Sequence, residues 1–372
     1  MRARAPSAAR AAVACALACL VACSSGGGEE SLARAPGASV AASAAAPLTS
    51  PSSAVAPSAA PSAAPSAAAS AGAPPPIAEP PAPRISAERA RELLFPEGLP
   101  AGASCAPDEL RCWIALRYEA DPKARELALE MYAELGDVVG LERAHAMDGG
   151  FRGSIRIVPE LPIGPHRKHL QAIAEAQRAS ARVYAELERR AGSALPYRQR
   201  ALGWRFFRSV GRTTPSAYAG GWEVGFNVSG SLHSSPEAVL ETIVHEVFHL
   251  NDQAHRSWSR RVLGPLSDAI VARCGTRIDC LRPHAPMKTL VRGGTYYAFQ
   301  PDNGDSAHEY AAELATRYFL EQRHALEGHD APPPLPGAAP GRYKCGPAPN
   351  AEAWRLLAEE FFGGVDLTGP CG

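Results

Sequence analysis

The pattern of apolar and polar residues changes sharply along the chain. Residues 1–22 carry a short apolar run, and residues 23–84 are almost entirely Ala, Pro, Ser and Gly. A mixture of large apolar and charged residues begins at about residue 85. Small residues cannot bury enough apolar surface to offset the conformational entropy lost on folding. We therefore predict a disordered tether over 23–84, followed by the folded part of the protein.

Helical signals dominate the beginning of the folded part. Residues 86–148 start with Ser86 as a helix cap, and the stretch "DPKARELALEMYAELG" has a second cap at Asp121. Pro122 suits the first position of that helix, and Gly136 suits its end. We predict a small helical subdomain over residues 85–150.

The periodicity changes after residue 150. Alternating apolar residues indicate strands, and apolar residues at helical spacing indicate one long helix. The predicted elements are strand 153–160, helix 165–192, strand 202–211 and strand 221–230. A further helix starts near Ser235. This order predicts an α+β fold for a domain over residues 151–372.

The stretch "LETIVHEVFHLNDQAH" (240–255) carries the motif H-E-x-x-H at His245, Glu246 and His249. Two histidines four residues apart project from one helix face, one turn apart, as a shared metal ion requires. Zinc suits two neutral imidazoles and a third N or O ligand, with a position left for water. We predict a catalytic Zn2+ site in which Glu246 is the general base.

The residues leave the third ligand open. His255 gives the longer spacing H-E-x-x-H-x-x-x-x-x-H of the metzincins, but Asp252 stands where that family has Gly. Helical spacing of apolar residues from 250 to 262 favours a continuous helix, which would carry His255 about 9 Å beyond His249. A carboxylate in "SAHEYAAELATRYF" (306–319) is the other possibility.

Two carboxylates in that segment compete. Glu309 lies three residues after Ser306, which is the spacing of a capping box and would tie Glu309 to the backbone. In that arrangement Glu313, one turn later on the same face, becomes the ligand.

Residues 295–322 resemble the second metal helix of the gluzincin metallopeptidases, closest to the anthrax lethal factor catalytic-domain family. In that family a Tyr-Ala pair precedes an E-x-x-A-E helix, and the first Glu binds zinc. The resemblance implies a zincin-like domain with Glu309 as ligand, Glu313 as a supporting carboxylate and Tyr297 as the phenol that stabilises the oxyanion. About five extra residues separate the Tyr from the helix here, so Tyr296 also stays a candidate.

The resemblance also implies how substrate binds. Strand 221–230, directly before the metal helix, is expected to be the sheet edge that lines the cleft. An extended peptide can add to such an edge through backbone hydrogen bonds. Protein or peptide hydrolysis is therefore the expected reaction.

The N-terminus indicates export. Three arginines within the first ten residues precede "AAVACALACLVAC", which is typical of a signal peptide and too short for a permanent membrane span. The sequence "LVAC" ending at Cys23 resembles a bacterial lipobox, which implies cleavage after residue 22 and lipidation of Cys23. Ser24 resembles the residue found in lipoproteins sent to the outer membrane. We expect a lipid-anchored protein of the cell envelope, in the outer membrane.

Charge and cysteine content further limit the class of protein and its compartment. The chain has 38 basic and 38 acidic residues and no basic cluster, which excludes a nucleic-acid-binding protein. An even number of cysteines follows Cys23, which predicts three disulfides in an exported chain. We favour pairing of near neighbours among 15 possible connectivities. The favoured pairs are Cys105–Cys112, Cys274–Cys280 and Cys345–Cys371.

Together these features predict a zinc metallopeptidase, a hydrolase tethered to the cell envelope. Two alternatives stay open: a zinc amidase that acts on cell-wall peptide, and a non-catalytic surface lipoprotein that binds a partner through residues 86–148. Asn251 and Asp252 either orient a ligand histidine or are ordinary surface residues. The remaining histidines are expected on the surface or in loops. They are His166, His169, His233, His284, His308, His324 and His329.

Overall fold

The computed structural model describes residues 85–148, 153–291, 294–300, 305–333 and 335–371. The predicted signal peptide, the lipidation site Cys23 and the predicted tether lie outside these residues.

Two of the first three helices begin directly after the capping residues predicted for them. The three helices are α1 (Ala87–Leu94), α2 (Leu110–Arg117) and α3 (Pro122–Leu135). The side chains of Ser86 and Asp121 accept hydrogen bonds from the first turns of α1 and α3. Gly136 ends α3 in the left-handed conformation at φ 75°, which glycine adopts without steric cost.

The prediction of helix up to residue 148 is wrong beyond Leu135. The chain instead forms β1 (Val138–Leu141) and β2 (His145–Asp148), both of which belong to the main sheet. All four residues of β1 are buried, so its burial has no periodicity that distinguishes a strand from a helix. A Cβ at Gly140 would lie 2.0 Å from the carbonyl oxygen of Leu93, so glycine lets α1 pack directly on this strand.

The sheet is mixed and has the order β2-β3-β4-β6-β5, with β1 paired to β4. Its remaining strands are β3 (Ser154–Pro159), β4 (Gly203–Ser209), β5 (Ala217–Gly220) and β6 (Glu223–Asn227). β4 runs parallel to β1 and β6, whereas β5 runs antiparallel to β6. The prediction that residues 221–230 form the sheet edge is therefore wrong. The short strand β5, rich in small residues, takes that place.

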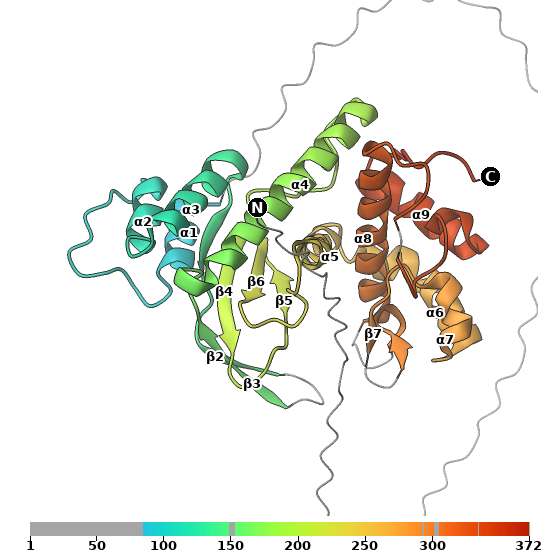
Figure 1. The fold of residues 1–372 in the computed structure, drawn as a ribbon, viewed down its shortest axis with the longest axis horizontal. Helices are drawn as coiled ribbons and strands as arrows, with labels where there is room; N and C mark the ends of the chain where they lie inside the picture. The colour runs from blue at the N-terminus through green and yellow to red at the C-terminus, as the bar shows by residue number, and fades with distance from the viewer. Residues whose placement is uncertain (1–84, 149–152, 292–293, 301–304, 334, 372) are drawn as a thin grey trace, which may run out of the picture. The chain divides into compact units, whose positions relative to one another are not determined.

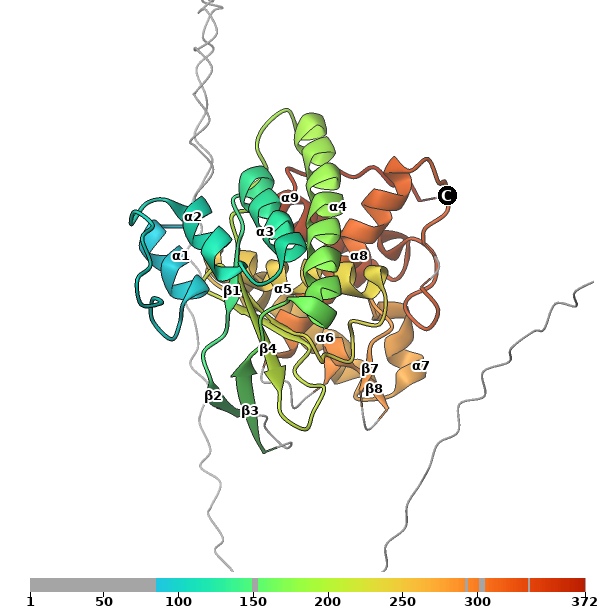
Figure 2. The ribbon, with the colours of Figure 1, turned by 60° about the vertical axis from the view of Figure 1, so that its left-hand side comes forward.

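Helices α4 (Arg167–Ala191) and α5 (Pro236–Ala254) pack against the sheet, and α8 (Ser306–Leu326) packs against α5. In Figure 1, α5 is seen nearly end-on between the sheet and α8, and Figure 2 shows α4 crossing in front. Trp204, Phe206 and Phe226 contribute to the core from the sheet and are fully buried. This arrangement confirms an α+β fold and places α5 between the sheet and α8.

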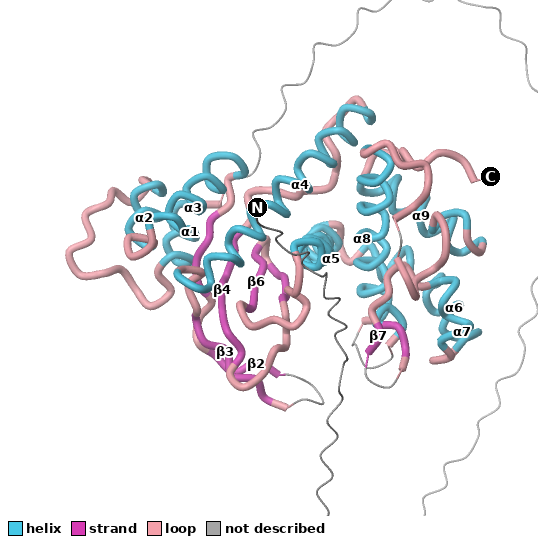
Figure 3. The backbone as a smooth tube through the Cα atoms, viewed as in Figure 1, coloured by secondary structure: helices cyan, strands magenta, loops and turns pink. Residues whose placement is uncertain are grey.

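The C-terminal half is mainly helical, as the tube in Figure 3 shows. Its other elements are α6 (Gly264–Cys274), α7 (Ile278–Leu281), α9 (Ala348–Phe361) and the hairpin β7 (Leu290–Val291) and β8 (Thr295–Tyr296). A π-helical turn covers Ser259–Leu263, and 3-10 turns cover Gly164–His166, Arg282–His284, Tyr297–Phe299 and Tyr343–Cys345.

Three disulfides join the predicted cysteine pairs. They are Cys105–Cys112, Cys274–Cys280 and Cys345–Cys371, which confirms the near-neighbour pairing. Disulfides persist in oxidising compartments, so they indicate an extracytoplasmic protein. Among the described residues, no helix has the length and apolar character needed to cross a bilayer.

Candidate metal centre

Helix α5 presents His245 and His249 on its less buried face. The Ser235 side chain caps the helix by accepting a hydrogen bond from the Ala238 amide, and Pro236 occupies the first position. The apolar residues of the opposite face are at most 3% exposed. They are Val239, Leu240, Ile243, Val244, Val247, Phe248 and Leu250. Burial of this face fixes the rotation of α5 and directs both imidazoles toward α8.

Glu309 reaches the histidines from the first turn of α8. Asp305 caps this helix and accepts a hydrogen bond from the His308 amide, whereas Ser306 is already its first residue. The alternative in which Ser306 forms a capping box with Glu309 is therefore wrong. The Glu309 carboxylate instead lies 3.1 Å from His245 Nε2.

Three ligand-type atoms converge at this point. His249 Nε2 lies 3.0 Å from His245 Nε2 and 3.5 Å from Glu309 Oε2. A tetrahedral zinc ion with bonds of about 2.0–2.1 Å holds its ligand atoms about 3.3–3.4 Å apart. The three side chains are 11–19% exposed, so solvent can reach the group. This group could hold a metal ion.

The structure does not bring His255 into the group. Helix α5 ends at Ala254, because Arg256 and Ser257 adopt left-handed conformations, and the predicted continuous helix is wrong here. His255 Nδ1 instead donates a hydrogen bond to Glu360 Oε1 at 2.6 Å.

Glu313 also lies outside the cluster of ligand atoms. It sits one turn after Glu309 on α8, and only 2% of its surface is exposed. Burial raises the pKa of its carboxyl to about 7, although the nearby His245 acts in the opposite direction.

The pKa values of the two histidines in the cluster shift in opposite directions. Burial lowers the pKa of His249 to about 4. Burial also acts to lower the pKa of His245, but the hydrogen bond to Glu309 and the surrounding carboxylates outweigh it and raise the pKa to about 9. Two imidazole nitrogens 3.0 Å apart can share only one proton between them. At least one of the two rings is therefore neutral, and the neutral imidazole is the form that binds a metal ion.

Glu246 neighbours this cluster on α5. Burial raises the pKa of its carboxyl to about 7, His245 counteracts this, and the negative charge of Glu309 raises the pKa further. A carboxylate with a pKa near neutrality can both accept and release a proton.

Tyr297, rather than Tyr296, belongs to the site. The Tyr297 ring centroid lies 6.3 Å from that of His245. Burial raises the pKa of its hydroxyl above the ordinary value, and the negative charges of Glu309 and Glu246 add to the effect. Tyr296 is buried and donates its hydroxyl hydrogen bond to the Gly337 carbonyl.

His308 and Asp252 belong to the site, although the sequence placed His308 on the surface or in a loop and left Asp252 open between orienting a ligand histidine and being an ordinary surface residue. The His308 ring stacks on that of His249, with 3.9 Å between centroids, and its Nδ1 donates to Asp252 Oδ2 at 2.8 Å. His308 is thus not a free surface residue, and Asp252 is fully buried. Asn251, also buried, bonds the backbone of Arg198 and Val247 rather than a ligand histidine. Asp252 lies three residues after His249, and this helical spacing is the sequence signal that places both side chains on the same face.

Other histidines expected on the surface are buried too. They are His169 and His284, at 8% and 4% exposure. Each packs away from the metal cluster: His284 Nδ1 bonds Asn350 Oδ1, and His169 packs near Phe226 and His233.

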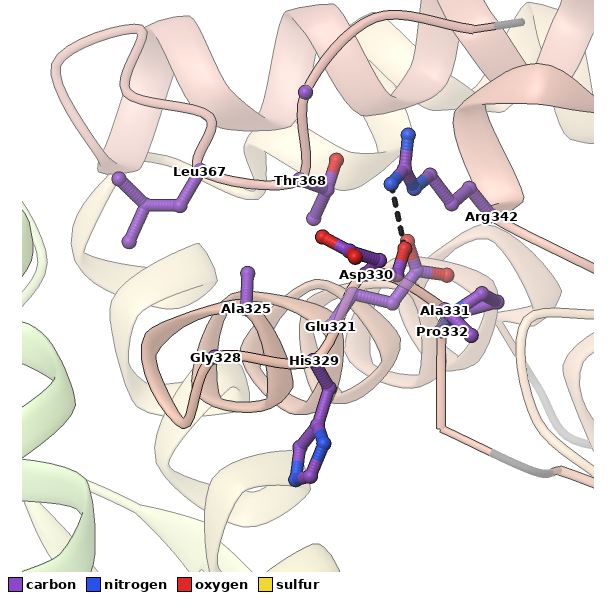
Figure 4. Close-up of a pocket in the computed structure, with 11 residues that line it drawn as sticks. Glu321, Ala325, Gly328, His329, Asp330, Ala331, Pro332, Arg342, Leu367 and Thr368 are labelled. Atoms are coloured by element: carbon purple, nitrogen blue, oxygen red, sulfur yellow. Dashed lines mark hydrogen bonds between the residues drawn. The ribbon is translucent and has the colours of Figure 1, made fainter.

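A separate cavity of about 230 Å3 lies at the other end of α8. Its lining includes Glu321, His329, Asp330 and Arg342, and Arg342 Nη2 donates to the Asp330 carbonyl (Figure 4). None of the cluster residues borders this cavity.

Comparisons of the chain with protein-family models, curated proteins and solved structures find no match. The functional assignment therefore depends on the geometry of the site.

Proposed function

We propose that the protein is a zinc-dependent peptidase that hydrolyses peptide bonds of proteins or peptides. The observation that carries this proposal is the convergence of His245, His249 and Glu309 at ligand distances, with Glu246 next to His245 on the same helix. Binding a metal requires only the three ligands. A half-buried carboxyl beside them, with its pKa raised to about 7, suits a general base for hydrolysis.

The three ligands suit zinc, because two imidazoles and one carboxylate leave a fourth position open. When bound, zinc supplies Lewis acidity, which polarises a carbonyl group and makes water nucleophilic near neutral pH. Glu246 accepts the proton that the attacking water loses and delivers it to the leaving amine as the C–N bond breaks. The Tyr297 hydroxyl is protonated at neutral pH, since burial raises its pKa above an already basic ordinary value, and it donates a hydrogen bond to the carbonyl oxygen as negative charge develops.

The sheet edge offers a place for an extended substrate. Among the described residues, β5 pairs with a strand on one side only, which is β6, and it contacts α5. An extended peptide added to β5 would gain backbone hydrogen bonds without requiring particular side chains. This favours polypeptide over small amides as substrate.

The proposed location is the cell envelope, with a lipid anchor on Cys23 in the outer membrane. The lipobox-like "LVAC" and the three disulfides support it. Cys23→Ala in the full chain is expected to move the protein from the membrane fraction to the soluble exported fraction. An unchanged membrane fraction would contradict the lipid anchor but not the peptidase.

Zinc content of the purified full chain tests the metal site. Glu309→Ala is expected to lose the metal, because it removes one of the three converging ligands. Glu313→Ala and His255→Ala serve as matched controls and are expected to keep one zinc ion per chain. Loss of zinc in His255→Ala would overturn the ligand set, and no zinc in the parent under metal-replete conditions would end the enzyme hypothesis.

Activity then distinguishes the substrate class. The zinc-loaded chain is expected to cleave casein, and Glu246→Gln should abolish that cleavage. Cleavage of purified peptidoglycan with no cleavage of casein would instead identify a cell-wall amidase.

A further inference from the structure

The described residues do not provide the His249 imidazole with the usual hydrogen bond that orients a metal ligand. Metal-binding histidines almost always donate their second ring N–H to a carboxylate, a carbonyl or water. His249 Nδ1 is buried and has no hydrogen-bond partner within the described part of the chain. Among the described residues, packing contacts rather than a hydrogen bond therefore hold the plane of this ring.

The His308 ring is in position to do this. Its centroid lies 3.9 Å from that of His249, and the two planes differ by 24°. Offset stacked rings at this separation attract each other through dispersion and restrict rotation about the ligand's side-chain bonds. The His245 ring does not stack in this way, because it is perpendicular to that of His249.

His308 is itself held in place from α5. Its Nδ1 donates to Asp252 Oδ2 at 2.8 Å. Asp252 is fully buried, and its carboxylate also accepts hydrogen bonds from the Ser259 amide at 2.6 Å and the Ser259 hydroxyl at 2.7 Å. Three donors thus satisfy a carboxylate whose position cannot change without leaving buried polar atoms unpaired.

The contact also joins the two metal helices. Asp252 follows His249 by three residues on α5, and His308 directly precedes Glu309 on α8. The Asp252–His308 hydrogen bond therefore fixes the position of the first turn of α8, which carries the third ligand, against the last turn of α5.

We propose that His308 is a positioning residue of the metal site, which holds the His249 ring by stacking and is itself anchored by Asp252. This inference rests on the proposed metal site and adds to it a residue that binds no metal. Residues that orient metal ligands typically change metal affinity or activity by about 10- to 100-fold when replaced.

Three substitutions separate the stacking from the hydrogen bond. His308→Ala removes both, His308→Phe keeps a ring over His249 but loses the donor to Asp252, and His308→Asn keeps a donor but has no ring. His324→Phe is the matched control. His324 lies on the same helix, its ring stacks on that of His329 at 4.1 Å, and its Nδ1 donates to Ala331 at 2.7 Å, away from the metal ligands.

The measurement is Zn2+ affinity of the full chain by chelator competition, with the Co2+ ligand-field spectrum as a second readout. His308→Ala and His308→Asn are expected to bind Zn2+ about 10- to 100-fold more weakly than the parent. His308→Phe should retain affinity within about tenfold of the parent, and His324→Phe should not change it. The Co2+ spectrum should change in His308→Ala and His308→Asn, because the coordination geometry depends on the angle of the His249 ring.

Two results would overturn the inference while leaving the peptidase proposal intact. One is parent-like Zn2+ affinity in His308→Ala, and the other is a His308→Asn protein that binds as tightly as His308→Phe. If His308→Ala does not fold, as judged by circular dichroism, the comparison of the Phe and Asn variants decides the matter. A parent chain that binds neither Zn2+ nor Co2+ refutes the metal site and this inference together.

Discussion

Arg317 offers the sharpest test of how helix α8, which carries Glu309, is held in the fold. It lies on α8, and its side chain is 1% exposed. Its Nε donates to Glu321 Oε1 at 2.5 Å, and its Nη1 lies 3.3 Å from the carbonyl oxygens of both Pro286 and Ala339. Nη2 donates to the Gly341 carbonyl. One guanidinium thus joins α8 to two segments distant in sequence.

The expected cost of Arg317→Leu follows from these contacts. Removing one partner of a buried ion pair leaves an uncompensated charge, here on Glu321, and typically costs about 3–5 kcal/mol. The backbone carbonyls that lose their donor add to this cost. Since a domain of this size loses about 2–4 °C in Tm per kcal/mol, we expect the Tm to fall by about 10 °C.

The assay is urea-induced unfolding followed by circular dichroism, with the disulfides intact. Arg355→Leu is the matched control, because Arg355 and Glu359 form another Arg–Glu pair four residues apart, at 2.7 Å but 56% and 54% exposed on α9. Exposed pairs of this kind contribute about 0.3–0.5 kcal/mol.

Breaking the buried pair should lower the free energy of unfolding much more than breaking the exposed pair. The view that burial makes this ion pair indispensable would be refuted if Arg317→Leu lowered the free energy of unfolding by less than about 1 kcal/mol, or if the two variants lowered it equally. Double replacement of Arg317 and Glu321 by apolar residues should recover part of the loss, because no buried charge is then left unpaired.

Three further predictions concern the candidate site and His233, whose ring stacks on that of Phe226 in the sheet. Glu246→Gln should keep its zinc, measured by atomic emission, but lose about 10²- to 10⁴-fold in kcat on casein; an active variant would exclude Glu246 as the base. Tyr297→Phe should lower kcat by about 10²- to 10³-fold with little change in KM; equal kcat would place Tyr297 outside the reaction. Burial lowers the pKa of His233 to about 4, so the folded protein resists protonation that the unfolded chain accepts below about pH 6.5. The free energy of unfolding should therefore fall by up to about 3 kcal/mol as pH decreases from 6.5 to 4. His233→Asn should remove that part of the pH dependence in urea titrations, and an unchanged slope would contradict it.

Local sequence signals predicted an element correctly where residues close together in the sequence determine its structure. The caps Ser86, Asp121 and Ser235 start their helices as predicted, because a capping hydrogen bond involves residues only three positions apart. The disulfides Cys105–Cys112 and Cys274–Cys280 follow the same logic, since their separations of 7 and 6 residues keep the two cysteines close. The prediction failed at β1, where pairing with the distant strand β4 outweighs weak local preference, and β5 was missed although it forms a tight hairpin with β6.

The sequence by itself determined the H-E-x-x-H pair, because helical geometry alone places His245 and His249 on one face. Only the tertiary structure decided that Glu309, rather than His255 or Glu313, meets them. The identity of the third ligand depends on where α5 ends and on how α8 packs against it. The spacing of residues within one segment does not determine either of these. The stacking of His308 on His249 has the same origin, since the two rings come from helices that meet only when the chain is folded.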